Sequence, residues 1–117
     1  MDPASQAAGI NFMIRSQGLE VTLAQMAAEV SVPQKIDEVT TLFQIVTDAT
    51  TLRYLYTVNA RGYHLLDSFK QNLIQNICAN DAMRPVLEAG GVIEQAFYRM
   101  DGRGIGTVRI TSESCAQ

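Results

Sequence analysis

Two segments of the C-terminal half decide the fold: YHLLDSFKQNLIQNIC (residues 63–78) and VIEQAFYRMDGRGIGTVRITSESC (residues 92–115). In the first segment, apolar residues recur at spacings of three and four, at Leu66, Phe69, Leu73 and Ile77. This periodicity predicts a helix with one apolar face. In the second segment, β-branched and aromatic residues flank the turn sequence DGRG (residues 101–104), which predicts a two-stranded hairpin. We therefore expect the apolar face of the helix to pack against a sheet.

The rest of the chain adds two helices and two strands. Apolar residues repeat at helical spacing over residues 19–30, and this helix must end before Pro33, because a residue that precedes proline is pushed toward extended geometry. Residues 40–47 and 51–59 alternate in character and predict two strands. A short helix is expected before the glycines at 90 and 91, which end it.

These elements predict an α+β fold in the order α-β-β-α-β-β, with a four-stranded antiparallel sheet and helices packed on one face. A length of 117 residues suits one domain, which we expect over residues 19–116. Residues 1–18 are expected to form an N-terminal arm or a poorly specified helix, because Gly9 and Gly18 weaken the helical pattern.

Composition argues against two classes of partner. The net charge is -3 and no local cluster of Lys and Arg occurs, so we expect no nucleic-acid partner. No apolar run approaches the roughly 20 residues that cross a bilayer, so we expect no membrane span.

The two cysteines, 37 positions apart, leave two readings open. A structural zinc needs four ligands and only one histidine is present, so we expect no metal and no cofactor. The cysteines form either a disulfide or two free thiols. Their even number and the position of Cys115 near the chain end favour a disulfide, provided that the compartment is oxidising.

Catalysis lacks a recognisable motif. His64 is the only histidine, and no Gly-x-Ser-x-Gly sequence supplies a nucleophile beside it. It lies at the start of the helix that ends at Cys78, about 21 Å away at a rise of about 1.5 Å per residue. We therefore expect no enzyme, and a small hydrolase is the least favoured function.

Several short stretches together resemble a known family. They are PQKIDEVTTL (33–42), LRYLYTV (52–58), NIC (76–78) and MRPVL (83–87), with Gly90, Tyr98, Asp101, Gly102 and Cys115. They resemble small exported bacterial proteins that carry the label of quorum-sensing-regulated virulence factors and whose molecular function is not established. The resemblance covers about residues 19–116. It implies an α+β fold, a periplasmic or secreted location with the signal peptide removed, and a disulfide between Cys78 and Cys115, but no catalytic residue.

Our first functional hypothesis is a non-enzymatic exported module that binds a protein or peptide partner and is associated with virulence. The N-terminal arm motivates it through four apolar residues that suit docking on a second copy as a homodimer: Ile10, Phe12, Met13 and Ile14. The alternative is a carrier of a small ligand, with a pocket between the second long helix and the sheet.

Overall fold

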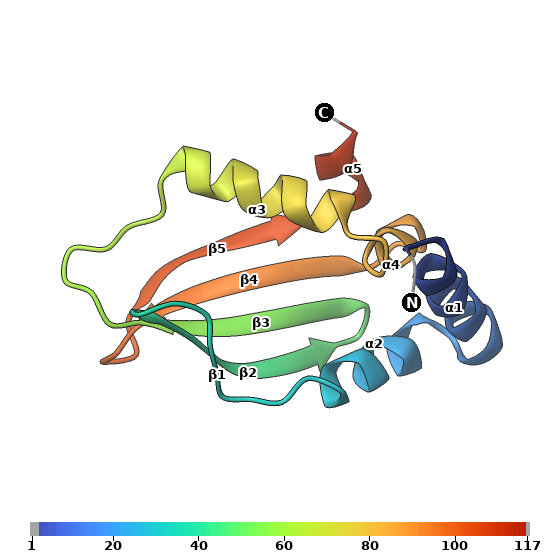
Figure 1. Cartoon of the computed structure of the whole chain (residues 1–117), viewed down its shortest axis with the longest axis horizontal. Helices are drawn as coiled ribbons and strands as arrows, with labels where there is room; N and C mark the ends of the chain where they lie inside the picture. The colour runs from blue at the N-terminus through green and yellow to red at the C-terminus, as the bar shows by residue number, and fades with distance from the viewer. Residues whose placement is uncertain (1–2, 117) are drawn as a thin grey trace.

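Five strands form one sheet in the order β1-β2-β3-β4-β5 in this computed structural model, which describes residues 3–116 (Figure 1). The strands are β1 (Gln34–Lys35), β2 (Thr40–Asp48), β3 (Thr51–Val58), β4 (Val92–Arg99) and β5 (Gly104–Ile110). The helices are α1 (Pro3–Gln17), α2 (Leu19–Ala28), α3 (Asp67–Ala79), α4 (Arg84–Glu88) and α5 (Ser112–Cys115). The predicted α+β class is confirmed, and α2 ends before Pro33 as expected.

The sheet is mixed, so the predicted four-stranded antiparallel sheet is wrong. Strand β2 pairs antiparallel with β1 and β3, and β5 pairs antiparallel with β4. The central pair β3 and β4 is parallel, in continuous register from Thr51 opposite Val92 to Val58 opposite Arg99. The connection between them carries α3 and α4, which return the chain to the end of the sheet where β3 began. The four predicted strands all belong to the sheet, but β1 adds a fifth strand and the helical crossover reverses the direction of β4, so the predicted order α-β-β-α-β-β is incomplete.

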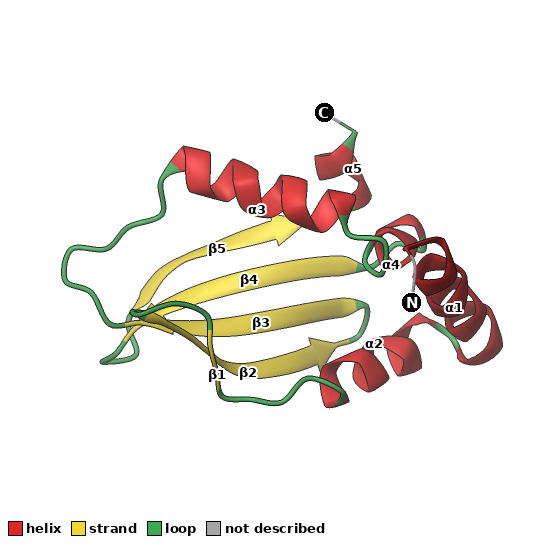
Figure 2. Cartoon of the chain, in the orientation of Figure 1, coloured by secondary structure: helices red, strands yellow, loops and turns green. Residues whose placement is uncertain are grey.

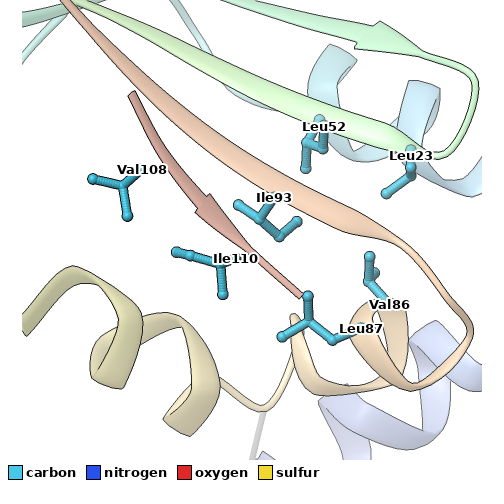
Figure 3. Packing of buried hydrophobic residues seen from close by; sticks show 7 residues of the cluster. All are labelled: Leu23, Leu52, Val86, Leu87, Ile93, Val108 and Ile110. Carbon is cyan, nitrogen blue, oxygen red and sulfur yellow. The ribbon is translucent and has the colours of Figure 1, made fainter. Parts of the chain in front are cut away.

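One buried cluster holds the helices against the sheet (Figure 3). It joins α2, α4 and three strands through side chains that are at most 5% exposed: Leu23, Leu52, Val86, Leu87, Ile93, Val108 and Ile110. The register explains this convergence, because Ile93 lies directly opposite both Leu52 and Ile110 on its neighbouring strands. Residues that face each other in this way share one side of the sheet.

Helix α3 covers the same side of the sheet as α2. Leu73, Ile74 and Ile77 of α3 pack against the buried cluster that also contains Leu23 of α2. Figure 2 shows α3 along the β4–β5 side of the sheet and α2 near β2, with α1 and α4 gathered at one end.

The turn between α4 and β4 depends on a close approach of two backbone segments. Gly90 has a positive φ of 93°, a conformation that glycine adopts without strain. A Cβ on Gly91 would lie 2.6 Å from Cγ1 and 2.8 Å from the carbonyl oxygen of Val86. The glycines therefore end α4 as predicted and let its last turn sit directly against the start of β4.

Candidate functional site

A cavity of about 170 Å³ lies between α3 and the sheet. Its walls come from three strands, α3 and two loops: Ile36, Asp37, Thr40, Tyr56, Tyr63, Phe69, Leu73, Gln95 and Phe97. The alternative hypothesis placed a pocket in this layer of the fold. The volume is nevertheless below the range of about 300–1,000 Å³ that small-molecule sites usually occupy.

Three aromatic rings contribute to the lining of the cavity. The parallel register of β3 and β4 sets Tyr56 directly opposite Phe97, and their rings stack with centroids 4.8 Å apart. Phe69 of α3 meets Phe97 edge to face at 5.8 Å. Both arrangements are favourable for aromatic pairs, so the three rings fix one another in place. An apolar or aromatic group that enters the cavity meets a preformed surface.

The loop before β2 forms the rim. Oδ1 of Asp37 accepts hydrogen bonds from the backbone N–H groups of Val39 at 2.9 Å and Thr40 at 2.8 Å. The N–H of Ile36 donates to the carbonyl oxygen of Thr40 at 2.9 Å. The N–H groups of Val39 and Thr40 lower the pKa of the Asp37 carboxyl below 3.8. An ionised, exposed carboxylate therefore holds this loop in a tight turn beside the cavity.

The interior of the cavity is neutral. Burial, reinforced by the neighbouring Tyr54, raises the pKa of Tyr56 to about 12. Burial also raises the pKa of Tyr63, with a smaller contribution from the charge of Asp37. Both phenols therefore keep their protons at any physiological pH, and each can donate a hydrogen bond.

Gln95 is the unusual member of this wall. It is 7% exposed, lies between Tyr54 and Val108 in the sheet, and faces the helix-covered side with Phe97. Its Oε1 is enclosed and has no hydrogen-bond partner among residues 3–116. Buried polar atoms are nearly always paired, and an unpaired one is unfavourable by about 1–3 kcal/mol. An amide that lines a cavity and lacks a partner is typical of a binding site rather than of a core.

A larger hollow of about 310 Å³ lies beside the disulfide, between α3 and α5. Its wall consists mainly of polar and surface side chains: Gln71, Ile74, Gln75, Cys78, Thr111, Glu113, Ser114 and Cys115. It has neither stacked rings nor an unpaired buried amide among the described residues, so we place the candidate site at the smaller cavity.

The predicted disulfide is confirmed. Cys78, at the end of α3, is bonded to Cys115 of α5, with the two Cα atoms 5.5 Å apart. The reading as two free thiols is therefore wrong. The bond ties the helix that covers the cavity to the segment that follows β5, so it holds one wall of the cavity against the sheet.

The four predicted arm residues lie in α1 and do not act together. Ile10 and Ile14 pack against the core cluster of their own chain, whereas Phe12 is 70% exposed and Met13 is half-buried. The expected homodimer therefore receives no support from the structure, because two of the four side chains are engaged within the chain. Residues 1–2 of the arm lie outside the described residues, and the division at Gly18 stays a prediction.

Other sequence expectations concern groups outside the cavity. His64 is exposed, and its Nδ1 lies 3.3 Å from the carbonyl oxygen of Gly62. Within residues 3–116, no three His, Cys, Asp or Glu side chains come together in a way that could hold a metal ion. In the same part of the chain, no helix combines the length and the apolar character needed to span a bilayer.

Comparison with known proteins shows a shared fold. No family model matches the chain, and no curated protein matches its sequence. A crystal structure of a candidate secreted protein from Pseudomonas aeruginosa is similar, with a TM-score of 0.76 and 24% identity over 83% of this chain and 92% of that one. The type 2 secretion system pilotin EpsS from Vibrio vulnificus has a TM-score of 0.68 and 14% identity, covering 96% of each chain.

The pilotin AspS of the type II secretion system of Vibrio cholerae has a TM-score of 0.62 and 16% identity, over 96% of this chain and 97% of that one. The neighbours are thus a candidate secreted protein and two pilotins, which share the fold of this chain. The comparisons show no link to quorum sensing or virulence.

Proposed function

We propose that this chain is an exported, non-enzymatic module that binds a peptide segment of a partner protein at the cavity between α3 and the sheet. The observation that carries this proposal is the ring-lined cavity with an unpaired amide, formed by Tyr56, Phe69, Phe97 and Gln95. Binding energy in protein interfaces concentrates in a few side chains that enter pockets of this kind.

The size of the cavity favours a peptide over a free small molecule. A volume of about 170 Å³ accommodates one side chain, whereas a drug-sized ligand needs a larger enclosure. A peptide gains the remaining contacts at the rim of the cavity, along Ile36 and the turn held by Asp37, both of which are exposed. The cavity then acts as the anchor point of a longer contact surface.

The shared fold supports the location and the kind of partner. The three similar structures are a candidate secreted protein and two type II secretion system pilotins. A disulfide is stable in the periplasm or outside the cell and rare in the cytosol, and this chain has one. We therefore place the partner among proteins of the bacterial envelope or exterior.

Selection of random twelve-residue peptides against the oxidised protein tests the proposal. Enriched peptides are expected to bind at least about tenfold more weakly when Leu73→Phe fills the cavity. The matched control is Asn76→Phe, which adds the same ring to α3 at an exposed position outside the cavity. Binding should survive in this control. Failure to enrich any peptide, or equal binding to all three proteins, would contradict the proposal.

A small-ligand carrier is the second candidate, and the position of the cavity between α3 and the sheet favours it. A ligand of this kind would have to be small, given the volume. A thermal-shift screen of fragment-sized compounds, repeated on Leu73→Phe, separates the two functions. Hits that are lost in the variant, without any enriched peptide, would favour the carrier.

A further inference from the structure

We propose that the cavity recognises the indole ring of a tryptophan side chain, with the Gln95 carboxamide accepting its N–H. This inference rests on the proposed peptide-binding function and names the side chain that the peptide would place in the cavity. Three properties of the cavity lead to it: its aromatic lining, the buried and unpaired acceptor of Gln95, and its neutral interior.

The lining suits a flat aromatic group. Tyr56 and Phe97 are stacked in parallel, and Phe69 stands edge-on to Phe97, so rings held in fixed orientations line the cavity. An incoming ring can continue an offset stack or an edge-to-face contact, and each such pair contributes beyond simple burial of apolar area. An aliphatic side chain gains the burial alone.

The number of hydrogen bonds selects among the aromatic and cationic side chains. Oε1 of Gln95 is the buried side-chain acceptor that lacks a partner among the described residues. Indole has one N–H and no acceptor, so one hydrogen bond satisfies both groups. Phenylalanine would leave Oε1 unpaired. Arginine would bring five N–H groups, most of which would lose water without gaining an acceptor.

Charge argues in the same direction. The tyrosines of the wall stay neutral, and the carboxylate of Asp37 lies on the exposed rim, where its Oδ1 is occupied by two backbone N–H groups. Asp37 is the one charged residue among the described residues of the lining, so a cation would be drawn to the rim and away from the interior beside Gln95. A neutral ring with a polar edge avoids the desolvation penalty of a buried charge.

Binding requires a small rearrangement of Gln95. Its Oε1 is enclosed by protein atoms, although the side chain lines the cavity. The last torsion of a glutamine has a broad energy profile, so the carboxamide can turn its oxygen toward a donor. The unbound protein keeps an unpaired acceptor, and the ligand supplies the missing donor.

The protein contains no tryptophan, which makes the test clean. The probes are indole and 1-methylindole, which share one ring system and differ in the N–H donor. Their fluorescence can be followed without background from tryptophan in the protein. Calorimetry gives their affinities. We expect indole to bind about tenfold more tightly than 1-methylindole to the wild type, as expected for a hydrogen bond to a buried group that is otherwise unpaired.

The variant Gln95→Leu separates the hydrogen bond from the steric effect of the added methyl group. The two probes should bind this variant with affinities within about twofold of each other, because the acceptor is gone. If Gln95→Leu does not fold, Gln95→Asn draws the carboxamide back by one methylene and should also reduce the preference. An unchanged preference in a folded variant would overturn the assignment to Gln95.

Two further outcomes separate this inference from the proposed function. Tighter binding of phenylguanidine than of indole, or no binding of indole, would overturn the inference. The proposed function would still be supported if peptides selected against the protein bind at the cavity. Binding of indole with the expected preference, but without any peptide that binds, would support the chemistry of the cavity and contradict the proposed peptide partner.

Discussion

Replacement of Gln95 by leucine should stabilise the protein although it removes a polar group from the sheet. Gln95 is 7% exposed, and its Oε1 has no hydrogen-bond partner among residues 3–116. Leucine has a similar size and no polar atom. The substitution therefore removes a desolvation penalty and leaves the neighbouring Tyr56 and Phe97 a side chain to pack against.

The magnitude follows from the cost of an unpaired buried acceptor. That cost is about 1–3 kcal/mol, and part of it is offset by contacts that the longer amide makes and leucine does not. We expect the free energy of unfolding to rise by about 1–2 kcal/mol. For a domain of 117 residues this corresponds to an increase in Tm of roughly 3–5 °C per kcal/mol.

Urea denaturation of the oxidised protein, followed by circular dichroism, measures the change. The slope m should stay constant while the midpoint rises. A folded Gln95→Leu variant that is less stable than the wild type would refute the reasoning, because it would mean that the carboxamide is fully satisfied in solution. Increased stability together with the loss of the preference for indole would show that the wild type retains Gln95 at the expense of stability, as binding sites often do.

The isosteric change Gln95→Glu is the control for polarity. Burial raises the pKa of a carboxyl in the folded state above its unfolded value of about 4.3. The variant should therefore be near wild-type stability below about pH 4 and lose stability as the pH rises through the unfolded value toward the folded one. A pH-independent difference from the wild type would contradict the burial of this side chain.

Three other changes test separate parts of the structure. Replacing Cys78 and Cys115 together by serine should lower stability by about 3–4 kcal/mol in a urea titration, because the bond closes a loop across a sequence separation of 37 residues; an unchanged midpoint would argue that the unfolded chain is not restrained by it. Asp37→Asn should weaken the dependence of the free energy of unfolding on pH in the acid range. The pKa of Asp37 is lowered in the folded protein, so its contribution to stability is present above about pH 4 and is lost as the pH falls through the pKa of the folded state. The same pH dependence of stability in the two proteins at acid pH would contradict this. Gly91→Ala should destabilise by about 1–3 kcal/mol, because the added Cβ would lie 2.8 Å from a carbonyl oxygen of α4. Gly9→Ala should instead stabilise by about 0.5–1 kcal/mol, because Gly9 lies in the interior of α1 and its added Cβ would have no atom within 4 Å. A Gly91→Ala variant more stable than Gly9→Ala would contradict the packing between α4 and β4.

Local structure could be predicted from the sequence because its determinants are local. The alternation over residues 40–47, the periodicity over residues 66–77 and the turn at residues 101–104 each correspond to an element of the structure. Strand β1 has only two residues and α5 only four, too few for a period to be visible in the sequence.

Strand direction depends on the path of the chain between β3 and β4 rather than on the residues within either strand. Both strands are rich in β-branched and aromatic residues, which suits parallel and antiparallel pairing equally. The helical crossover decides between the two. The indication in the sequence was the helix of 13 residues between the two strands, because neighbouring parallel strands need a long crossover connection, usually a helix.

The candidate site was only partly accessible from the sequence. In the strand predicted within residues 92–100, Gln95 falls on the same face as Ile93 and Phe97, where a polar side chain is unusual, and this was the indication that sequence analysis missed. The contribution of Asp37 and Tyr63 could not be found in this way. They reach the cavity from loops, and loop paths are set by tertiary contacts.

The single parallel pair has a consequence for the order in which the chain folds. Strands β2 and β3 form a hairpin from neighbouring residues, and so do β4 and β5, so each can form with little loss of loop entropy. The β3–β4 pair must wait until residues 59–91 have been closed into a loop. Contacts of such sequence separation slow folding. Substitutions at Leu52 or Ile93, which meet across the β3–β4 pair, should therefore change the folding rate more than substitutions at residues whose contacts stay within one hairpin.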